Sequence, residues 1–356
     1  VTHEQLMLLE DNRSVTLEYT DTSFNGEIPQ SYTVLRAVFD EWFAEQVETQ
    51  GVFIAAGVHV DDLIEEEGKI VGVIAGEDEM RAEVVIAADG VNSLIAQKAG
   101  LRPDITYHEI GIGVKEVIEL PASVIEDRFH LCPQEGAARM ILGGSNGVNG
   151  GGFLYTNRDS ISLGCVFLPQ VVAEKKISIH EIFQNLKMHP AIFELIEGGR
   201  TIEYSAHLVP EAGWKHVPAK LHRPGFLMVG DAAGFVINQG YTIRGMDLAL
   251  LSGLAAAKAI IQETDISAVG PAYIQQLDQI GLTAAMKQFA DFPSIMDNPR
   301  LFSTYPAMAN AVYKQLYAID EVAPESVRKG LMNTVNNHTS LWALIKDGWN
   351  IVRSAK

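Results

Sequence analysis

The sequence has few cysteines and no long apolar run. Only Cys132 and Cys165 occur among its 356 residues. A cubane iron–sulfur cluster normally needs four cysteine thiolates, so this chain cannot supply one alone. We expect two reduced core thiols in a cytoplasmic protein rather than a disulfide. No uninterrupted apolar run reaches about 18 residues, so the sequence predicts no transmembrane helix.

Positive charge is also scarce. Lys and Arg number 27 against 45 Asp and Glu, which leaves a formal net charge of -18. Such a balance argues against bulk binding of nucleic acid, although local basic patches stay open. With 47% hydrophobic and 20% charged residues, the composition is that of a globular protein. The length favours two domains.

Several motifs of site chemistry are missing as well. No His/Cys/Asp cluster has metal-ligand spacing, and no serine stands in a G-x-S-x-G elbow, so we name no metal ligand and no catalytic residue. There is no signal peptide and no initiator Met. The chain opens at "VTHEQLMLLEDN", which we interpret as the middle of a longer protein.

The strand and helix patterns divide the chain into five segments. Residues 1–30 contain alternating strand sequence, and residues 31–106 combine a helix with continuous apolar strands typical of α/β sheets. Residues 107–223 carry short strands bounded by Gly, Asn and Pro, which predict an antiparallel sheet with a helical stretch interrupted near Pro190. The α/β pattern returns over 224–290, and 291–356 is expected to be helical.

One stretch, "GFLMVGDAAGFVINQGYTIRGMDLALLSGLAAAKAI" from Gly225 to Ile260, poses the main question. It begins as an apolar strand, turns at Gly230-Asp231, and ends as a helix of small residues. A helix N-terminus presents unpaired N–H groups and suits an anionic or electron-rich ligand group. Asp231 can accept a hydrogen bond from a ligand hydroxyl, but an ordinary turn with a capping aspartate fits equally well.

Three motifs together resemble the glutathione-reductase-type flavoproteins. They are "YTVLRAVFDEWF", "VVIAADGVNS" and "VGDAAGF" followed by a Gly-rich helix start. The resemblance implies that Arg36 contacts FAD phosphates or ribose, that Asp231 holds a ribityl hydroxyl, and that the helix start faces the flavin pyrimidine edge. The FAD-binding residues so implied are Arg36, Asp89, Gly90, Gly230, Asp231, Gly240, Thr242, Gly245 and Met246.

A closer resemblance is to the branch with FixC and electron-transfer flavoprotein–quinone oxidoreductase. It is carried by "GIGVKEVIELP", "SVIEDRF", "GGGFLYTN", "YSAHLVPEAG", "GYTIRGMDLA" and "MDNPRLFSTYP". It implies a three-layer α/β FAD domain (31–106 and 224–290), an inserted antiparallel substrate or quinone domain (107–223, with strands of 1–30), and a helical end (291–356). It also implies an FAD-dependent oxidoreductase that passes electrons from an electron-transfer flavoprotein toward quinone or a separate ferredoxin-like iron–sulfur subunit.

The same branch supplies candidates for the flavin and quinone edge. These are Gly151, Gly152 and Phe153, which alternatively form a hairpin with glycines at positive φ, and His207, which we interpret rather as a satisfied core group. Arg244 could steady a reduced flavin or contact a partner with equal plausibility. Lys115-Glu116 needs no role beyond an ion pair across strands.

One departure from the family is large. Its members begin with a βαβ unit carrying G-x-G-x-x-G, and nothing before Arg36 fits that pattern. "GGSNGVNGGG" at 143–152 does not open a helix. We therefore expect a fragment without the N-terminal segment, in which the cradle for the FAD pyrophosphate is incomplete.

Two rival functions and one question of location stay open. A geranylgeranyl-reductase-like flavoenzyme acting on a lipid alkene would share the fold, and a cofactor-free docking subunit would explain the missing motif. We expect a cytoplasmic protein, with peripheral contact at the inner face of the membrane as an open alternative. The tail "SLWALIKDGWNIVRSAK" places Leu341, Leu344, Ile345, Trp349 and Val352 on one helical stripe that suits a membrane surface, but we favour packing on the core or on a partner subunit.

Overall fold

The computed structural model describes residues 1–104, 106, 110–145, 147–240, 242–319 and 326–354. The chain forms two compact units. Unit 1 contains Val1–Val52, Ile112–His207 and Met296–Val352, and unit 2 contains Phe53–Gly111, Leu208–Ile295 and Arg353–Lys356. Residues 31–52 and the C-terminal helices thus group with the large sheet of unit 1. The expected boundary at 107 lies outside the described residues.

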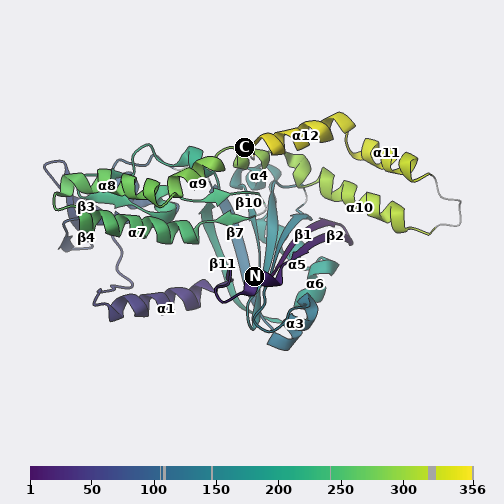
Figure 1. Cartoon of the computed structure of the whole chain (residues 1–356), viewed down its shortest axis with the longest axis horizontal. Coiled ribbons are helices and arrows are strands. Elements are labelled where there is room, and N and C mark those ends of the chain that lie inside the picture. Colours follow the sequence, from purple (N-terminus) through teal and green to yellow (C-terminus); the bar gives the residue numbers. More distant parts are fainter. Residues whose placement is uncertain (105, 107–109, 146, 241, 320–325, 355–356) are drawn as a thin grey trace. The chain divides into compact units, whose positions relative to one another are not determined.

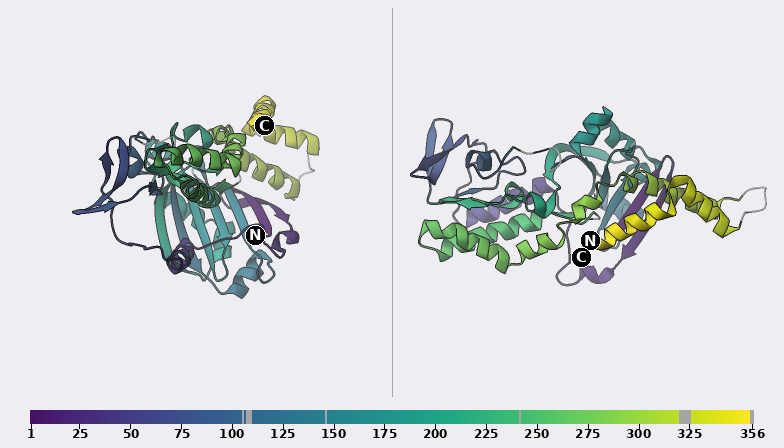
Figure 2. Two further views of the ribbon diagram at one scale, coloured as in Figure 1. Left: turned by 60° about the vertical axis from the view of Figure 1, so that its left-hand side comes forward. Right: turned by 90° about the horizontal axis from the view of Figure 1, so that it is seen from above.

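Unit 1 is built on a seven-stranded sheet (Figures 1 and 2). Its strands lie in the order β11 (Arg200–Pro210), β7 (Ile110–Glu119), β10 (Ser160–Phe167), β9 (Gly150–Thr156), β8 (Ala137–Gly143), β1 (His3–Glu10) and β2 (Arg13–Thr20). The expectation of a purely antiparallel sheet is wrong in one place, because β1 pairs with β8 in parallel. These strands lie far apart in sequence, so no tight hairpin forces them to run antiparallel.

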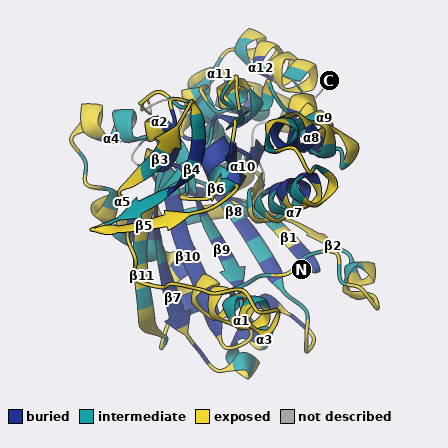
Figure 3. Ribbon diagram, turned by 90° about the vertical axis from the view of Figure 1, so that its left-hand side faces the viewer, coloured by how far each residue is buried: buried dark blue, intermediate teal, exposed yellow. Residues whose placement is uncertain are grey.

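One face of this sheet carries the core of unit 1. Leu154 in β9 and Ile141 in β8 alternate with less buried neighbours, while Leu163 lies in β10, which is buried along almost its whole length; all three are fully buried, and the centre of the sheet is dark blue in Figure 3. The helices that complete this core are α3 (Ala122–Phe129), α5 (Ile179–Lys187) and α6 (Pro190–Ile196). Pro190 opens α6, so the predicted interruption of the helical stretch is confirmed.

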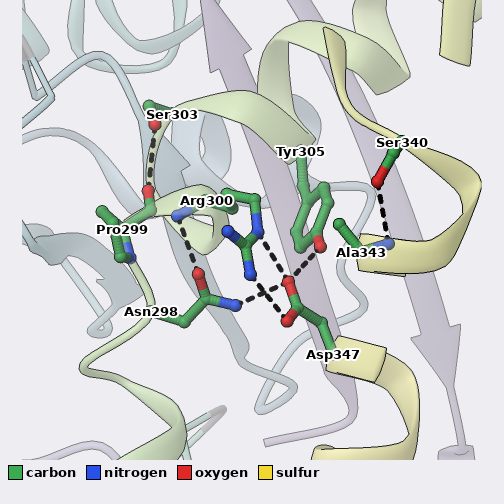
Figure 4. A network of polar contacts seen from close by, with 8 residues as sticks. All are labelled: Asn298, Pro299, Arg300, Ser303, Tyr305, Ser340, Ala343 and Asp347. Carbon is green, nitrogen blue, oxygen red and sulfur yellow. Dashed lines mark hydrogen bonds and ion pairs between the residues drawn. The ribbon is translucent and has the colours of Figure 1, made fainter. Parts of the chain in front are cut away.

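A polar network ties the last helix of unit 1 to the segment before it (Figure 4). Asp347 lies on α12 (Leu341–Ser354) and is buried. Its carboxylate accepts hydrogen bonds from Arg300 at 2.7 Å, from Asn298 at 2.8 Å, and from the hydroxyl of Tyr305. The Arg300 guanidinium holds the pKa of Asp347 below its ordinary value. The ion pair therefore fixes α12 against η5 (Pro299–Leu301) and α10 (Thr304–Tyr317).

The apolar stripe of α12 is largely exposed, although its Leu344 is half-buried. Leu341, Ile345, Trp349 and Val352 are all at least half exposed, and Trp342 is exposed as well. The core-packing half of our interpretation is thus wrong, and packing on a partner stays a prediction. Among the described helices, none is both long and apolar enough to cross a membrane.

Unit 2 centres on a short sheet in the order β12 (His222–Arg223), β13 (Phe226–Met228) and β6 (Val85–Ala87), with β13 parallel to β6. The helices α7 (Met246–Gln262) and α8 (Ile266–Gln279) run side by side (Figure 1) and add their small and apolar residues to the same core. The hydroxyl of buried Tyr273 on α8 donates to the carbonyl of Met228 at 2.8 Å. This bond satisfies a polar group in an apolar interior.

The rest of the described chain forms a second sheet of unit 2 and further helices and strands. A separate antiparallel sheet of unit 2 contains β3 (Asp62–Glu66), β4 (Lys69–Ala75) and β5 (Asp78–Arg81), with a turn at Glu67-Gly68 between the first two. The others are η1 (Thr22–Asn25), α1 (Arg36–Thr49), α2 (Leu94–Lys98), α4 (Pro169–Lys175), η2 (Gly213–His216), η3 (Gly230–Ala233), β14 (Ile237–Asn238), β15 (Ile243–Arg244), α9 (Leu282–Gln288), η4 (Phe292–Ile295) and α11 (Val327–His338).

Both cysteines are free, but they differ in environment. Cys165 is fully buried in β10, and burial raises the pKa of its thiol to about 12. Cys132 is exposed. The expectation of two core thiols is therefore confirmed for Cys165 and wrong for Cys132, which lies in the turn after α3 rather than in the sheet.

Candidate functional site

Two turns expected to hold the cofactor meet at one edge of the unit 2 sheet. The strands β6 and β13 are parallel neighbours, and the backbone N–H of Val229 donates to the carbonyl of Ala87 at 3.0 Å. Asp89-Gly90 follows β6, and Gly230-Asp231 follows β13. Ligands of α/β sheets bind beyond the carboxyl ends of the strands, so this edge is the candidate site.

The first turn is held by its own aspartate. The carboxylate of Asp89 accepts from the hydroxyl of Ser93 at 2.8 Å and from the N–H of Ile95 at 3.0 Å, and so caps the start of α2. Gly90 has φ +78°, and a methyl group added there would meet no atom within 4 Å. The turn therefore presents open space at Gly90, while Asp89 has a structural task.

The second turn is held closely against helix α7. Gly230 has φ +56°, and a methyl group on it would lie 3.2 Å from Cβ of Ala249. The N–H of Gly230 donates to the hydroxyl of Ser252 at 2.9 Å, and this hydroxyl in turn donates to the carbonyl of Ala249. The group that approaches Gly230 is thus the helix itself, and Ser252 was not singled out from the sequence.

Asp231 lies at the N-terminus of the same helix. A methyl group on Gly245, the residue before α7, would lie 3.6 Å from Oδ1 of Asp231. Arg102 donates to the carbonyls of Asp231 and Ala232, at 3.3 and 2.8 Å, and so fixes the turn from its other side. The structure brings Asp231 and Gly245 together as the resemblance implies, while Arg102 was missed because no local motif marks it.

A small β-ribbon leads from this turn into the helix. The strands β14 and β15 pair through Asn238, and the N–H of Gln239 donates to the carbonyl of Thr242 at 3.0 Å. Gly240 has φ +76°, and its N–H donates to Oδ1 of buried Asn238 at 2.9 Å. Met246 begins α7 and is partly exposed. Arg244 pairs with Asp247 of the first helical turn.

One carboxyl beside this ribbon is unusual. Oε1 of Glu211 is fully covered and has no hydrogen-bond partner among the described residues. Burial raises the pKa of Glu211 to about 7. Its backbone carbonyl accepts from Nδ2 of Asn238 at 3.3 Å, which places Glu211 next to β14. The sequence shows only a glutamate after Pro210, so nothing there marked its burial.

The edge candidates of unit 1 lie within a strand. Gly151, Gly152 and Phe153 belong to β9, which follows β8 along the chain and pairs with it antiparallel, so the hairpin is observed and these three residues lie in its second strand rather than in a loop. A methyl group on Gly152 would lie 2.7 Å from Cδ2 of Leu186, so the end of that side chain would have to shift to admit it. The ring of Phe153 stacks on Tyr155. Their role at the flavin or quinone edge stays a prediction.

Arg36 and His207 also belong to unit 1. Arg36 is the first residue of α1 and pairs with Asp40 at 2.9 Å on an exposed face. His207 lies exposed in β11, so our interpretation of it as a core group is wrong. The expected ion pair across strands is observed for Lys115, which pairs with Glu203 of β11 at 3.3 Å, whereas Glu116 pairs with Lys187 of helix α5 at 2.5 Å.

The edge of unit 2 suits an extended, hydroxyl-bearing, electron-rich ligand. It combines an open glycine turn, a carboxylate able to accept from a hydroxyl, and the N-terminus of a 17-residue helix. These features fit the ribityl chain and ring of FAD. In the described part of the chain, no group of His, Cys, Asp and Glu side chains could hold a metal ion.

Comparisons with known proteins agree with the motifs. Residues 110–209 match the family profile "ETF-QO, ubiquinone-binding", and residues 292–356 match the "ETF-QO/FixC family C-terminal domain". The chain is 42% identical to Protein FixC of Escherichia coli K12 over 352 residues, which cover 98% of this chain and 82% of FixC. The chain belongs to the FixC/electron-transfer flavoprotein–quinone oxidoreductase family.

Other relatives are consistent with this family. The chain is 44% identical to the probable electron transfer flavoprotein-quinone oxidoreductase YdiS of the same strain, again over 98% of this chain and 82% of YdiS. A geranylgeranyl bacteriochlorophyll reductase-like protein from Thermoplasma acidophilum superimposes with a TM-score of 0.66 at 16% identity, covering 99% of this chain and 82% of that one. This likeness shows the fold, and the predicted family and fold class are confirmed.

Proposed function

We propose that this member of the FixC family binds FAD and acts as an oxidoreductase that passes electrons from an electron-transfer flavoprotein toward a quinone. The observation that carries the proposal is 42% identity to FixC over 98% of the chain. The match of residues 110–209 to a ubiquinone-binding profile supports quinone as the acceptor. FAD would supply the redox chemistry, because it accepts and releases electrons that no side chain can carry.

The residues at the edge of the unit 2 sheet would bind and orient the cofactor. Asp231 would accept a hydrogen bond from a ribityl hydroxyl, and the N-terminus of α7 at Gly245 would face the electron-rich edge of the ring. Gly90 would leave room for the ligand at the neighbouring turn. In this arrangement the protein positions the flavin and sets its potential, and no protein acid or base needs to act on a substrate.

Replacing Asp231 by Ala in the intact protein tests the cofactor site. Losing one buried, charge-assisted hydrogen bond costs about 1.5–3 kcal/mol, so we expect FAD affinity to fall roughly 10- to 150-fold. Fluorescence titration of the apoprotein with FAD measures this. The matched control is Asp278→Ala, which removes the same charge from an exposed position of α8. Equal FAD affinity in Asp231→Ala and the unmodified chain would refute this role.

Two alternatives predict different outcomes. A cofactor-free docking subunit would not bind FAD in the same titration. A geranylgeranyl-reductase-like enzyme would bind FAD but would reduce a prenyl alkene and not a quinone. The similarity to the Thermoplasma protein supports only the shared fold, whereas the identity to FixC and YdiS supports quinone oxidoreduction.

The finer part of the proposal concerns partners. Cys132 and Cys165 cannot ligate a four-cysteine cluster between them, so we propose a separate ferredoxin-like iron–sulfur subunit as an electron partner. The exposed apolar stripe of α12, with Trp342 and Trp349, supports an external contact of this helix. A peripheral contact with the cytoplasmic face of the membrane and a contact with the partner subunit both fit such a stripe.

A further inference from the structure

Arg102 reaches the Asp231 turn from a distant segment of unit 2. Its Nη1 donates to the carbonyl of Asp231 at 3.3 Å and to the carbonyl of Ala232 at 2.8 Å. Ala232 is fully buried, so its carbonyl needs a partner inside the protein. A guanidinium is always charged, and hydrogen bonds from a charged donor are stronger than those from a neutral one. Arg102 therefore holds this turn more firmly than a neutral side chain could.

The turn itself has little that stiffens it. It is the four-residue 3-10 helix η3, whose hydrogen-bond geometry is poorer than that of an α-helix. Gly230 and Gly234 at its two ends have φ +56° and φ +73°, in a region that glycine enters without steric cost. Ser252 binds the N–H of Gly230, whereas Arg102 binds the carbonyls of the next two residues. Asp231 therefore lies in the part of the turn that Arg102 fixes.

The path of the chain explains how Arg102 arrives at this turn. Helix α2 begins at the first cofactor turn, where the carboxylate of Asp89 caps it. At its other end, Gly100 has φ +70° and the N–H of Leu101 donates back to the carbonyl of Ala96 at 3.0 Å, which is the Schellman ending of a helix. This ending turns the chain back, and Arg102 is the next residue. The segment from Asp89 to Arg102 thus begins at one cofactor turn and ends on the other.

We propose that Arg102 is a positioning residue of the FAD site, which fixes the Asp231 turn for the ribityl chain before the cofactor binds. This inference rests on the proposed FAD-binding function. A site that is already ordered loses less conformational entropy when its ligand binds. Without Arg102, binding of FAD would itself have to order the turn, and the affinity would fall by that cost. Arg102 acts through Asp231 and not by contact with the flavin.

Arg102→Gln in the intact protein tests the inference. The substitution removes one charged hydrogen-bond donor from the turn, so we expect FAD affinity to fall roughly tenfold. Fluorescence titration of the apoprotein with FAD measures this. The matched control is Arg128→Gln, because Arg128 is also half-buried and donates to the carbonyl of Leu195 at 3.0 Å, but it lies in unit 1. The control should lower stability and leave FAD affinity unchanged.

A double-mutant cycle separates positioning from a general structural role. Arg102→Gln is combined with Asp231→Ala, and its effect on FAD affinity is measured with Asp231 present and with Asp231 absent. If Arg102 acts through Asp231, Arg102→Gln should cost about tenfold in the first background and less than about threefold in the second. Equal losses in the two backgrounds would overturn the inference.

A shortened ligand gives an independent measurement. Lumiflavin has the ring of FAD but no ribityl chain, so it offers no ribityl hydroxyl to Asp231. Arg102→Gln should therefore weaken the binding of riboflavin about tenfold and leave the binding of lumiflavin unchanged. A purely structural role would weaken the binding of both ligands alike, and that result would contradict the proposed role of Arg102.

The outcomes also separate this inference from the proposed function. If the intact protein binds no FAD, both are wrong. If Asp231→Ala weakens FAD binding but Arg102→Gln does not, only the role of Arg102 is wrong. If Arg102→Gln does not fold, Arg102→Lys takes its place in the cycle, because lysine keeps a charged donor but lacks the planar guanidinium. A loss of affinity that requires Asp231 then supports the inference, and an equal change, or none, in both backgrounds overturns it.

Discussion

Gly164 in the large sheet of unit 1 and Gly90 in a turn of unit 2 look alike in sequence but have opposite surroundings. In β10, a methyl group on Gly164 would lie 2.3 Å from the ring of Phe153. In the turn after β6, a methyl group on Gly90 would meet nothing within 4 Å. The first glycine makes room for the protein's own packing, and the second leaves space that the chain does not fill.

The largest effect is expected from closing the space in the sheet. Gly164→Ala would place Cβ 2.3 Å from Phe153 and 2.6 Å from the backbone carbonyl of Val114. The ring can move but the strand cannot, so we expect a loss of about 3 kcal/mol in the free energy of unfolding. Urea unfolding monitored by circular dichroism measures it. A change below about 0.5 kcal/mol, the range of ordinary surface substitutions, would show that the sheet is less crowded than the structure indicates.

The difference between local patterns and crowding by distant segments also explains which features could be predicted from the sequence alone. The strand, turn and helix from Phe226 to Gln262 and the break at Pro190 follow from local patterns, and both are confirmed. The parallel pairing of β1 with β8 depends on contacts between distant segments. Gly152 lies in a crowded strand, but its local sequence would fit an open turn equally well. Local patterns therefore predict elements, whereas crowding and register come from tertiary contacts.

The residues of the candidate site also fall into two groups, those that a local motif marks and those that only the fold brings to the site. Asp231 and Gly245 could be predicted because the motif places both in one short stretch, and the structure brings them together. Arg102 contacts the Asp231 turn from a distant segment, so no spacing in the sequence marks it. Glu211 becomes notable only because one of its oxygens is covered, and burial of a single atom is not encoded in a residue pattern.

A smaller effect should separate backbone strain from ligand contact. Gly90→Ala forces a side chain into the left-handed region at φ +78°, which costs about 1 kcal/mol of stability. Gly198→Ala is the matched control, because Gly198 has φ +77° and open space but lies in unit 1, in the turn after α6. We expect equal losses of stability and a loss of FAD affinity only for Gly90→Ala. Equal FAD affinity in both variants would place the cofactor away from the first turn.

The smallest effect is expected on helix α7, and its sign is informative. Gly253 lies inside this helix, and a methyl group there would meet no atom within 4 Å. Glycine costs more backbone entropy than alanine in a helix, so Gly253→Ala should stabilise the apoprotein by about 0.5–1 kcal/mol. Thermal unfolding at fixed protein concentration measures this gain.

Leu250 and Leu254 of the same helix are about half exposed. A destabilising alanine would mean that this face of α7 is covered in the folded protein, and a loss that grows with protein concentration would identify a second copy of the chain as the cover. A stabilising alanine would show that α7 is open along Gly253, as Gly90 is open at the turn, in contrast to the closed sheet around Gly164.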